Sequence, residues 1–427
     1  MSEVTQRQEL FNLPEKVEEG ADEHGPYHLI PLSMLRGGQT KEFKVHLKPF
    51  KHILTDTAPS PRGWYKNKHE PPRVRPRPCY SEALLTVPYG GYCVIGCPFC
   101  YIDHGTRGYR ATGLPTANPA YPDSIRKQLA KMQIATAAYI SSFTEPFQAL
   151  EEKYHITQRL AQVFADERLP MFFLSRKIPP EWVPEMLLLN PYSYMQWSIN
   201  ALNEETYRRL SPGSYSPQRL FQEVRRYADL GIYTSFQINP VLPGITTLEE
   251  IKELVKEIAR AGGNHVIFKF CEQTTGGKHI LVDRLRQRNL PGTEDFISSM
   301  TQVIGGVYTV NQKLRIAWLQ EILPLTQHLG ISMSLCYEYY SNGKAGANLA
   351  PWFTTADQCH GRGVPLYYRP YPDQPFQALE GCYRKGCLYC EEYGTKACAN
   401  PMLLKARALT YRDYTSTTIE QKQAAYN

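Results

Sequence analysis

The sequence has no long apolar run and no secretion signal. No window approaches the roughly 18 consecutive apolar residues that a membrane-spanning helix requires. The opening segment, MSEVTQRQELFNLPEKVEEG, is polar and acidic, and it contains no apolar core of a signal peptide. We therefore expect a cytoplasmic protein that has no membrane partner.

A strong net charge is also absent. The formal charge of +7 is mild for 427 residues, and it permits a polyanionic partner without requiring one. Hydrophobic residues make up 42% of the chain and charged residues 21%, which excludes a disordered polyelectrolyte and is typical of a globular protein. The chain is too long for one ordinary core, so we predict a large domain with appendages or two to three domains.

Cysteine, by contrast, is plentiful. The chain has 11 cysteines, three of them within residues 93–100 and five more within residues 359–398. In a chain without a secretion signal, such clusters indicate metal or redox chemistry rather than a disulfide framework.

The first cluster, in the segment YCVIGCPFCY, consists of Cys93, Cys97 and Cys100. Gly96 and Pro98 supply a tight turn, so that one loop can direct three thiolates at one small inorganic cluster. Three protein ligands leave one iron of a 4Fe-4S cube free to bind a small molecule. The alternatives are zinc, which normally takes four ligands in a structural site, and three unrelated buried thiols.

Segments typical of strands alternate with segments typical of helices from residue 82 onward. Short apolar runs predict strands at residues 82–87, 134–140, 171–174, 194–199, 233–238 and 265–270, with a candidate seventh at 331–335. Apolar residues between them recur at helical spacing, and we expect Ser124, Ser216 and Thr247 to cap three helices. The alternation predicts an α/β fold, a partial (β/α)6 barrel of parallel strands. The chemistry of such a barrel lies at the carboxyl ends of its strands.

Polar motifs follow these predicted strands: TEPFQALEEKYHITQRL, FLSRK, SINALNEETYRRLSPGSYSPQRL and INPVLPG. Together with the cysteine spacing, they resemble the spore photoproduct lyase-like branch of the radical S-adenosylmethionine (SAM) superfamily, often called DNA repair photolyases, over roughly residues 82–270. The resemblance implies an enzyme that reductively cleaves SAM to a 5′-deoxyadenosyl radical, which then abstracts a hydrogen atom from the substrate. It also implies an electron donor such as flavodoxin or ferredoxin.

The resemblance assigns roles to individual residues. It implies that Cys93, Cys97 and Cys100 hold the SAM-binding 4Fe-4S cluster and that Tyr101 is catalytic. The residues that it implies for SAM binding are Thr144, Glu145, Arg176, Lys177, Ser198, Asn200 and Asn239. Each of these polar residues has a helix-capping role as its structural alternative.

Two positions depart from the family pattern. Where spore photoproduct lyase has a cysteine that returns a hydrogen atom to the substrate, this chain has Ser142, whose O–H bond is too strong for that role. The tyrosine relay of that enzyme corresponds to Phe99 and Tyr101, so half of the relay is missing. The sequence therefore argues against the repair of thymine dimers by that mechanism.

The second cysteine cluster lies near the carboxyl terminus. We predict that Cys359, Cys382, Cys387 and Cys390 bind an auxiliary iron–sulfur cluster, with structural zinc as the alternative metal. Uncoordinated thiols are the third alternative. Cys336 and Cys398 compete for a place in the ligand set.

Three regions are expected: an amino-terminal extension at residues 1–80, the barrel at 81–335, and a cysteine-rich carboxyl-terminal domain at 336–427. Residues 40–80 carry ten basic and three acidic side chains, with Trp64 and Tyr65 between them, a composition suited to nucleic acid. Pro71, Pro72, Pro76 and Pro78 also fit an extended linker.

The hypothesis of a radical SAM enzyme leaves two substrate classes open. The first is a nucleic-acid base or lesion, and the second is a peptide or small metabolite modified with help from the auxiliary cluster. The remaining alternative is a non-catalytic, metal-stabilised protein that binds nucleic acid.

Overall fold

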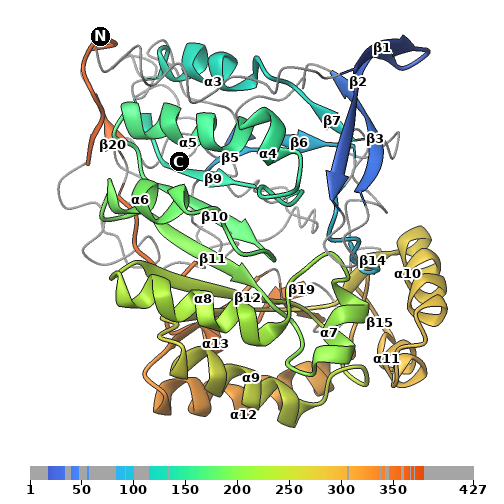
Figure 1. The fold of residues 1–427 in the computed structure, drawn as a ribbon. Helices are drawn as coiled ribbons and strands as arrows, with labels where there is room; N and C mark the ends of the chain where they lie inside the picture. The colour runs from blue at the N-terminus through green and yellow to red at the C-terminus, as the bar shows by residue number, and fades with distance from the viewer. Residues whose placement is uncertain are drawn as a thin grey trace.

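The computed structural model describes residues 18–33, 40–47, 55–56, 83–91, 93–100, 115–132, 134–141, 143–304, 307–336, 338–341, 346–356, 360–365, 367–369 and 371–378. Its central element is an eight-stranded sheet with helices packed along its outer face (Figure 1). Within the described residues, no helix is both long and apolar enough to cross a bilayer.

Seven strands of the central sheet run parallel, and one antiparallel strand lies at the edge. In sheet order they are β17 (Ser332–Leu335), β13 (His265–Phe270), β12 (Tyr233–Val241), β11 (Tyr194–Ser198), β10 (Met171–Ser175), β9 (Ala137–Ile140), β5 (Ala83–Thr86) and the antiparallel β4 (Thr55–Asp56). The α/β fold with a partial parallel barrel is confirmed, and the candidate seventh strand is present as β17.

The second predicted strand is divided in the structure. The single strand expected at residues 134–140 is instead β8 (Ile134–Ala135) and β9, which belong to different sheets. β8 pairs antiparallel with β20 (Tyr367–Tyr368), a strand distant in sequence. The segment has no glycine or proline to mark the break, so the division depends on a tertiary partner.

The helices are short to medium in length. They are α3 (Tyr121–Leu129), α4 (Glu151–Tyr154), α5 (Ile156–Asp166), α6 (Trp182–Leu188), α7 (Glu204–Leu210), α8 (Pro217–Asp229), α9 (Leu248–Arg260), α10 (Thr275–Gln287), α11 (Thr293–Ser299), α12 (Gln312–His328) and α13 (Ala350–Phe353). The apolar stripes of α5, α8 and α9 are buried in the main core, which accounts for their helical spacing in the sequence.

Two of the three predicted helix caps are confirmed. The side-chain oxygens of Ser216 and Thr247 accept the backbone N–H groups of Arg219 and Glu250 at 3.4 and 3.1 Å. The Glu250 carboxylate accepts the backbone N–H groups of residues 202 and 203, each at 3.0 Å. The amino end of α9 is thereby tied to the loop that precedes α7.

The predicted cap at Ser124 is wrong. α3 begins earlier, at Tyr121, with Pro122 in its first turn, where the missing N–H group costs nothing. Ser124 lies inside the helix, and its hydroxyl donates a hydrogen bond to the carbonyl of Ala120 at 3.1 Å.

The smaller sheets surround this core. β1 (Glu18–Asp22), β2 (Gly25–Ser33), β3 (Thr40–Leu47), β7 (Thr116–Ala117) and β6 (Tyr89–Gly90) form one sheet, whose β2–β3 hairpin projects at the upper right of Figure 1. The others contain β14 (Glu272–Thr274), β16 (Val307–Thr309) and β15 (Gln302–Ile304); β18 (Tyr339–Ser341) and β19 (Gly346–Asn348); and β21 (Gln377–Ala378), β20 and β8.

The two faces of the central sheet differ in polarity. Phe173 and Phe236 point outward into the main apolar core. Neighbouring strand residues point to the opposite, inner face, where Gln196 donates to the Ser235 hydroxyl at 3.3 Å and accepts from the amide of Gln237 at 2.9 Å. This part of the inner face is therefore polar and hydrogen-bonded, whereas Phe172 and Tyr194 on the same face belong to a second buried apolar cluster.

Residues 360–365 pack against the inner face of the sheet near the amino ends of β10 and β11. The His360 ring lies 4.9 Å from the ring of Phe172, and its Nδ1 atom accepts the Gln196 amide at 2.8 Å. A Cβ atom on the next residue, Gly361, would lie 2.2 Å from the His265 ring. Burial lowers the pKa of His360 to about 3, so the ring is neutral at physiological pH.

A buried ion pair braces the carboxyl ends of β13 and β17. Arg315 of α12 contacts Glu338 at 2.5 Å, and both side chains are 1% exposed. The other Glu338 oxygen accepts the backbone N–H group of Phe270 at 2.6 Å. Burial raises the pKa of Glu338, and Arg315 opposes that rise.

We expect Arg315→Met to lower the free energy of unfolding by about 3 kcal/mol, because it leaves the buried Glu338 carboxylate without its guanidinium partner. Urea unfolding followed by tryptophan fluorescence measures the change. Lys313→Met, on the exposed side of the same helix, is the matched control and should change stability by less than about 0.5 kcal/mol. Equal losses in the two variants would contradict the prediction.

Candidate active site at the carboxyl ends of the strands

The cysteine loop, residues 93–100, follows β6. Gly96 adopts φ +64° at its turn, and the backbone N–H groups of Gly96 and Cys100 donate to the carbonyls of Cys93 and Cys97, both at 3.3 Å. Cys93, Cys97 and Cys100 form no disulfide bonds. Cys93 is buried, and Cys97 and Cys100 are partly exposed.

The loop after α7 packs against this turn. The N–H group of Gly213 donates to the carbonyl of Ile95 at 3.1 Å, and the Ser211 hydroxyl lies 3.9 Å from Cys97 Sγ. A Cβ atom at Gly213 would lie only 2.0 Å from the carbonyl oxygen of Val94. Glycine at this position allows the two loops to touch.

Glu145 links the cysteine loop to β10. Its backbone N–H group donates to Cys93 Sγ at 3.4 Å. Its carboxylate accepts the Ser175 hydroxyl at 2.6 Å and the N–H groups of Arg176 and Phe147 at 3.0 and 3.2 Å. Burial raises the pKa of Glu145, and these donors oppose the rise. The predicted role of Glu145 in SAM binding stays a prediction beside this positioning role.

Arg176 joins four elements at the centre of the site. Its guanidinium donates to the carbonyl of Asn239 at 2.8 Å, the Ser211 hydroxyl at 3.1 Å and the Asn200 side chain at 3.4 Å. It also lies over the Phe99 ring, 5.3 Å from the centroid. The structure thus brings together Arg176, Asn200 and Asn239, three of the residues predicted for the SAM site.

Lys177 is a buried cation, 7% exposed. Burial lowers its pKa, while Glu145, Glu152 and Cys93 raise it. Among the described residues, its ammonium group has no hydrogen-bond or ion-pair partner. A carboxylate near the cysteine loop would match these unused donors.

Thr144 and Ser198 are also buried at this edge. The Thr144 hydroxyl donates to the carbonyl of Tyr89 at 2.7 Å, which leaves its oxygen able to accept. Ser198 ends β11, and its carbonyl accepts the Tyr207 hydroxyl at 3.4 Å. Their roles toward SAM stay predictions.

Sequence reasoning missed two cations at this edge. Lys269 points from β13 toward the interior and contacts Glu272 at 2.7 Å. Arg288, after α10, donates to the carbonyl of Gly96 at 2.9 Å. The position of Lys269 near the end of a predicted strand was an available signal, whereas no local pattern places Arg288 beside the cysteine loop.

The donor set fits an iron–sulfur cube. Among the described residues, no three histidine, cysteine or acidic side chains are arranged as the ligands of one metal ion would be. A cube binds each thiolate at a different iron, so its cysteines surround it instead of meeting at one atom. Cys93, Cys97 and Cys100, with the N–H group of Glu145 directed at one sulfur, are suited to that larger group.

Several predicted site residues lie outside the described residues. They are Tyr101, Ser142, Cys359, Cys382, Cys387, Cys390 and Cys398. The basic, proline-rich segment from residue 57 to residue 80 also lies outside them.

Residues 87–258 match the radical SAM superfamily. The chain is 39% identical over 407 residues to a protein of Pseudomonas phage M6 named radical SAM Nα-GlyT isomerase, covering 91% of this chain and 85% of that protein.

Two solved structures are similar to parts of this chain. A spore photoproduct lyase mutant with bound AdoMet and dinucleoside spore photoproduct is 14% identical, with a TM-score of 0.46, covering 62% of this chain and 80% of that chain. SuiB of Streptococcus suis bound to S-adenosylmethionine is 19% identical, with a TM-score of 0.35, covering 49% of this chain and 46% of that chain.

Glu151 is a buried carboxylate that joins the strand before the cysteine loop to the start of α5. Its carboxylate accepts the Tyr89 hydroxyl at 2.5 Å and the N–H groups of Thr157 and Gln158, each at 2.8 Å. Burial raises the pKa of Glu151 from 4.5 to about 7, although these donors act in the opposite direction.

This shift predicts a pH dependence of stability. Between pH 4.5 and about 7 the folded protein holds a proton on Glu151 that the unfolded chain has lost, so stability falls as the pH rises. Relative to Glu151→Gln, which cannot titrate, the wild-type free energy of unfolding should fall by about 3 kcal/mol between pH 4.5 and pH 8. Urea unfolding of both proteins across this range measures the difference, and parallel curves would contradict the prediction.

Proposed function

The chain belongs to the radical SAM superfamily, and we propose that it is an isomerase that acts on Nα-GlyT, as the phage M6 relative is named. The identity of 39% over 91% of the chain carries this proposal. It includes the cysteine loop, the barrel and most of the flanking regions, so the two proteins share more than the common radical SAM core.

For the substrate of this chain, we take Nα-Gly as glycine attached through its amino nitrogen and T as thymidine in DNA. The ten basic and three acidic residues of the segment 40–80, with Trp64 and Tyr65, support a nucleic-acid substrate. The other interpretation of the letters, a glycine–threonine peptide, corresponds to the peptide class that the sequence left open. It is an outcome of the test below.

Isomerisation fixes the hydrogen balance of the reaction. An isomerase neither adds nor removes atoms, so a hydrogen atom that leaves the substrate must be replaced. The Cα–H bond of a glycine unit is weak, because the adjacent nitrogen and carboxyl groups delocalise an unpaired electron. Two residues count against dimer repair: Ser142 and Phe99 stand where the lyase pattern has cysteine and tyrosine.

Different residues at the carboxyl ends of the strands would bind the cluster, bind SAM and position the loops. Cys93, Cys97 and Cys100 would hold the 4Fe-4S cluster. The Lys177 ammonium, which has no partner among the described residues, would bind the SAM carboxylate. When bound, the cluster and SAM supply a carbon-centred radical that abstracts a hydrogen atom. Arg176 holds the strand-end loops in place through its three hydrogen bonds.

Residues packed at the amino ends of the strands favour entry of the substrate from the carboxyl ends. The His360 ring lies over the amino ends of β10 and β11, tilted against the rings of Phe172 and Tyr194. A substrate therefore reaches the polar interior from the carboxyl ends, beside the cysteine loop. Exclusion of water and oxygen from this space protects a reactive intermediate.

The test uses reconstituted, anaerobic enzyme with SAM, a reductant and an oligonucleotide that contains glycine-modified thymidine. We expect nucleoside digestion and liquid chromatography–mass spectrometry to show a new nucleoside of unchanged mass. Deuterium at the glycine Cα should slow its formation, because that bond breaks during the reaction.

The matched variants are Cys97→Ala and Cys271→Ala. The first should abolish conversion, because it removes a cluster ligand. The second should keep conversion, because Cys271 is a buried thiol outside the cysteine loop. Conversion of a glycine–threonine peptide without conversion of the oligonucleotide would contradict the DNA substrate, and a change in product mass would contradict isomerisation.

We also propose that the second cysteine cluster binds an auxiliary iron–sulfur cluster through Cys359, Cys382, Cys387 and Cys390. The spacing of the last three cysteines within GCYRKGCLYC supports this proposal, because it resembles the spacing of the first loop.

Metal counting on intact protein tests the auxiliary cluster. We expect about eight irons per chain, and about four in Cys387→Ala, because two cubes hold four irons each. Cys398→Ala is the matched control and should keep about eight. About four irons with one zinc in the wild-type protein would contradict the auxiliary cube.

A further inference from the structure

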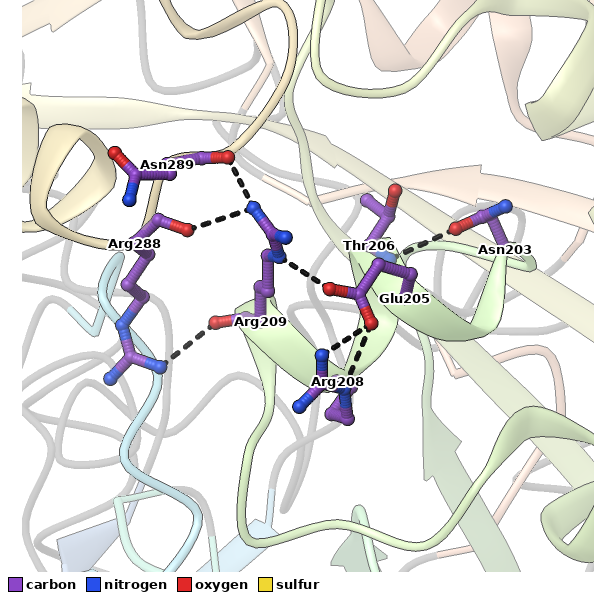
Figure 2. Close-up of polar contacts among 7 residues, drawn as sticks. All are labelled: Asn203, Glu205, Thr206, Arg208, Arg209, Arg288 and Asn289. Carbon is purple, nitrogen blue, oxygen red and sulfur yellow. Dashed lines mark hydrogen bonds and ion pairs between the residues drawn. The ribbon is translucent and has the colours of Figure 1, made fainter.

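Two arginines from distant parts of the sequence each donate hydrogen bonds to the backbone of the other's segment (Figure 2). The Arg209 guanidinium donates to the carbonyl of Arg288 at 3.2 Å and to that of Asn289. In return, the Arg288 guanidinium donates to the carbonyl of Arg209 at 2.9 Å. Each side chain thereby satisfies the backbone of the other segment, which joins the end of α7 to the loop after α10.

Arg288 extends this contact to the cysteine loop. A second guanidinium nitrogen donates to the carbonyl of Gly96 at 2.9 Å, the residue directly before Cys97. One planar group therefore connects the carboxyl end of α7 with the turn of the cysteine loop. The fork geometry of a guanidinium allows this double contact, which a lysine ammonium reproduces poorly.

The charge of Arg209 is neutralised by a carboxylate, whereas that of Arg288 is not neutralised by any described residue. Arg209 contacts the Glu205 carboxylate at 2.7 Å, and Arg208 contacts the same carboxylate. Arg288 has no carboxylate partner among the described residues. Burial lowers the pKa of Arg288, and the nearby Cys97 opposes this effect. The charge of Arg288 is thus directed toward the cysteine loop.

We propose that Arg288 is a positioning residue that anchors the Gly96–Cys97 turn and makes one-electron reduction of the cluster more favourable. Reduction adds negative charge to a group already surrounded by thiolates. A fixed positive charge nearby stabilises that reduced form more than the oxidised form. Arg209 supports this role by fixing the backbone from which Arg288 extends. The inference depends on the superfamily membership and not on the identity of the substrate.

The test is an anaerobic redox titration of the cluster in the holoenzyme, followed by electron paramagnetic resonance. At a fixed potential, we expect the ratio of reduced to oxidised cluster to be about tenfold lower in Arg288→Gln than in wild type, which is a decrease of about 59 mV in midpoint potential. Arg208→Gln is the matched control, because it removes the same charge from an arginine that contacts Glu205 and no part of the cysteine loop. Its ratio should stay at the wild-type value.

Arg288→Lys separates charge from anchoring. It should keep a ratio close to wild type but lose iron to a chelator faster than Arg208→Gln does, because the fork between Gly96 and Arg209 is broken. An Arg288→Gln ratio equal to wild type would overturn the proposal, and so would an equal decrease in Arg208→Gln. If Arg288→Gln holds too little iron for titration, equal rates of iron loss in Arg288→Lys and Arg208→Gln overturn it.

Discussion

The hydrogen bonds of the buried residue Glu145 hold the cysteine loop and the end of β10 together at the carboxyl ends of the strands. A buried carboxylate is costly unless donors surround it, and Glu145 obtains them from Ser175, Arg176 and Phe147. Its backbone meanwhile donates to Cys93 Sγ. The same residue thus satisfies its own burial, orders the end of β10 and holds one thiol of the cysteine loop, so the sulfur positions are connected to the register of the sheet.

A parallel sheet makes this concentration of function possible. Because the central strands run in one direction, their carboxyl ends meet at one edge, where Arg176 and Asn200 after β10 and β11 join Asn239 of β12 in a single network. The opposite edge has a structural use, since the segment around His360 closes it. Polar side chains that gather beside three cysteines, at the carboxyl ends of parallel strands, suit the chemistry of a radical SAM enzyme.

The charged residues near this edge of the sheet differ in how deeply they are buried. The Arg315–Glu338 pair is fully buried and braces β13 and β17, so its charges serve the fold. The Arg209–Arg288 pair lies nearer the surface, where one charge is neutralised by Glu205 and the other faces the cysteine loop. Lys177 lies between these extremes, buried but unpaired among the described residues. Such an ammonium is costly to maintain without an anionic ligand, which is why its position supports a binding role.

The sequence alone determined the strand and helix order, the cysteine loop and the superfamily, because hydrophobic periodicity and ligand spacing are local properties. Five of the six predicted strands and β17 appear where expected, and Ser216 and Thr247 cap their helices as predicted. The tertiary structure decided what depends on distant partners. β8 separates from β9 because β20 pairs with it, and Ser124 is not a cap because α3 begins earlier. Arg288 reaches Gly96 across 192 positions of the chain, and no local pattern records such a contact.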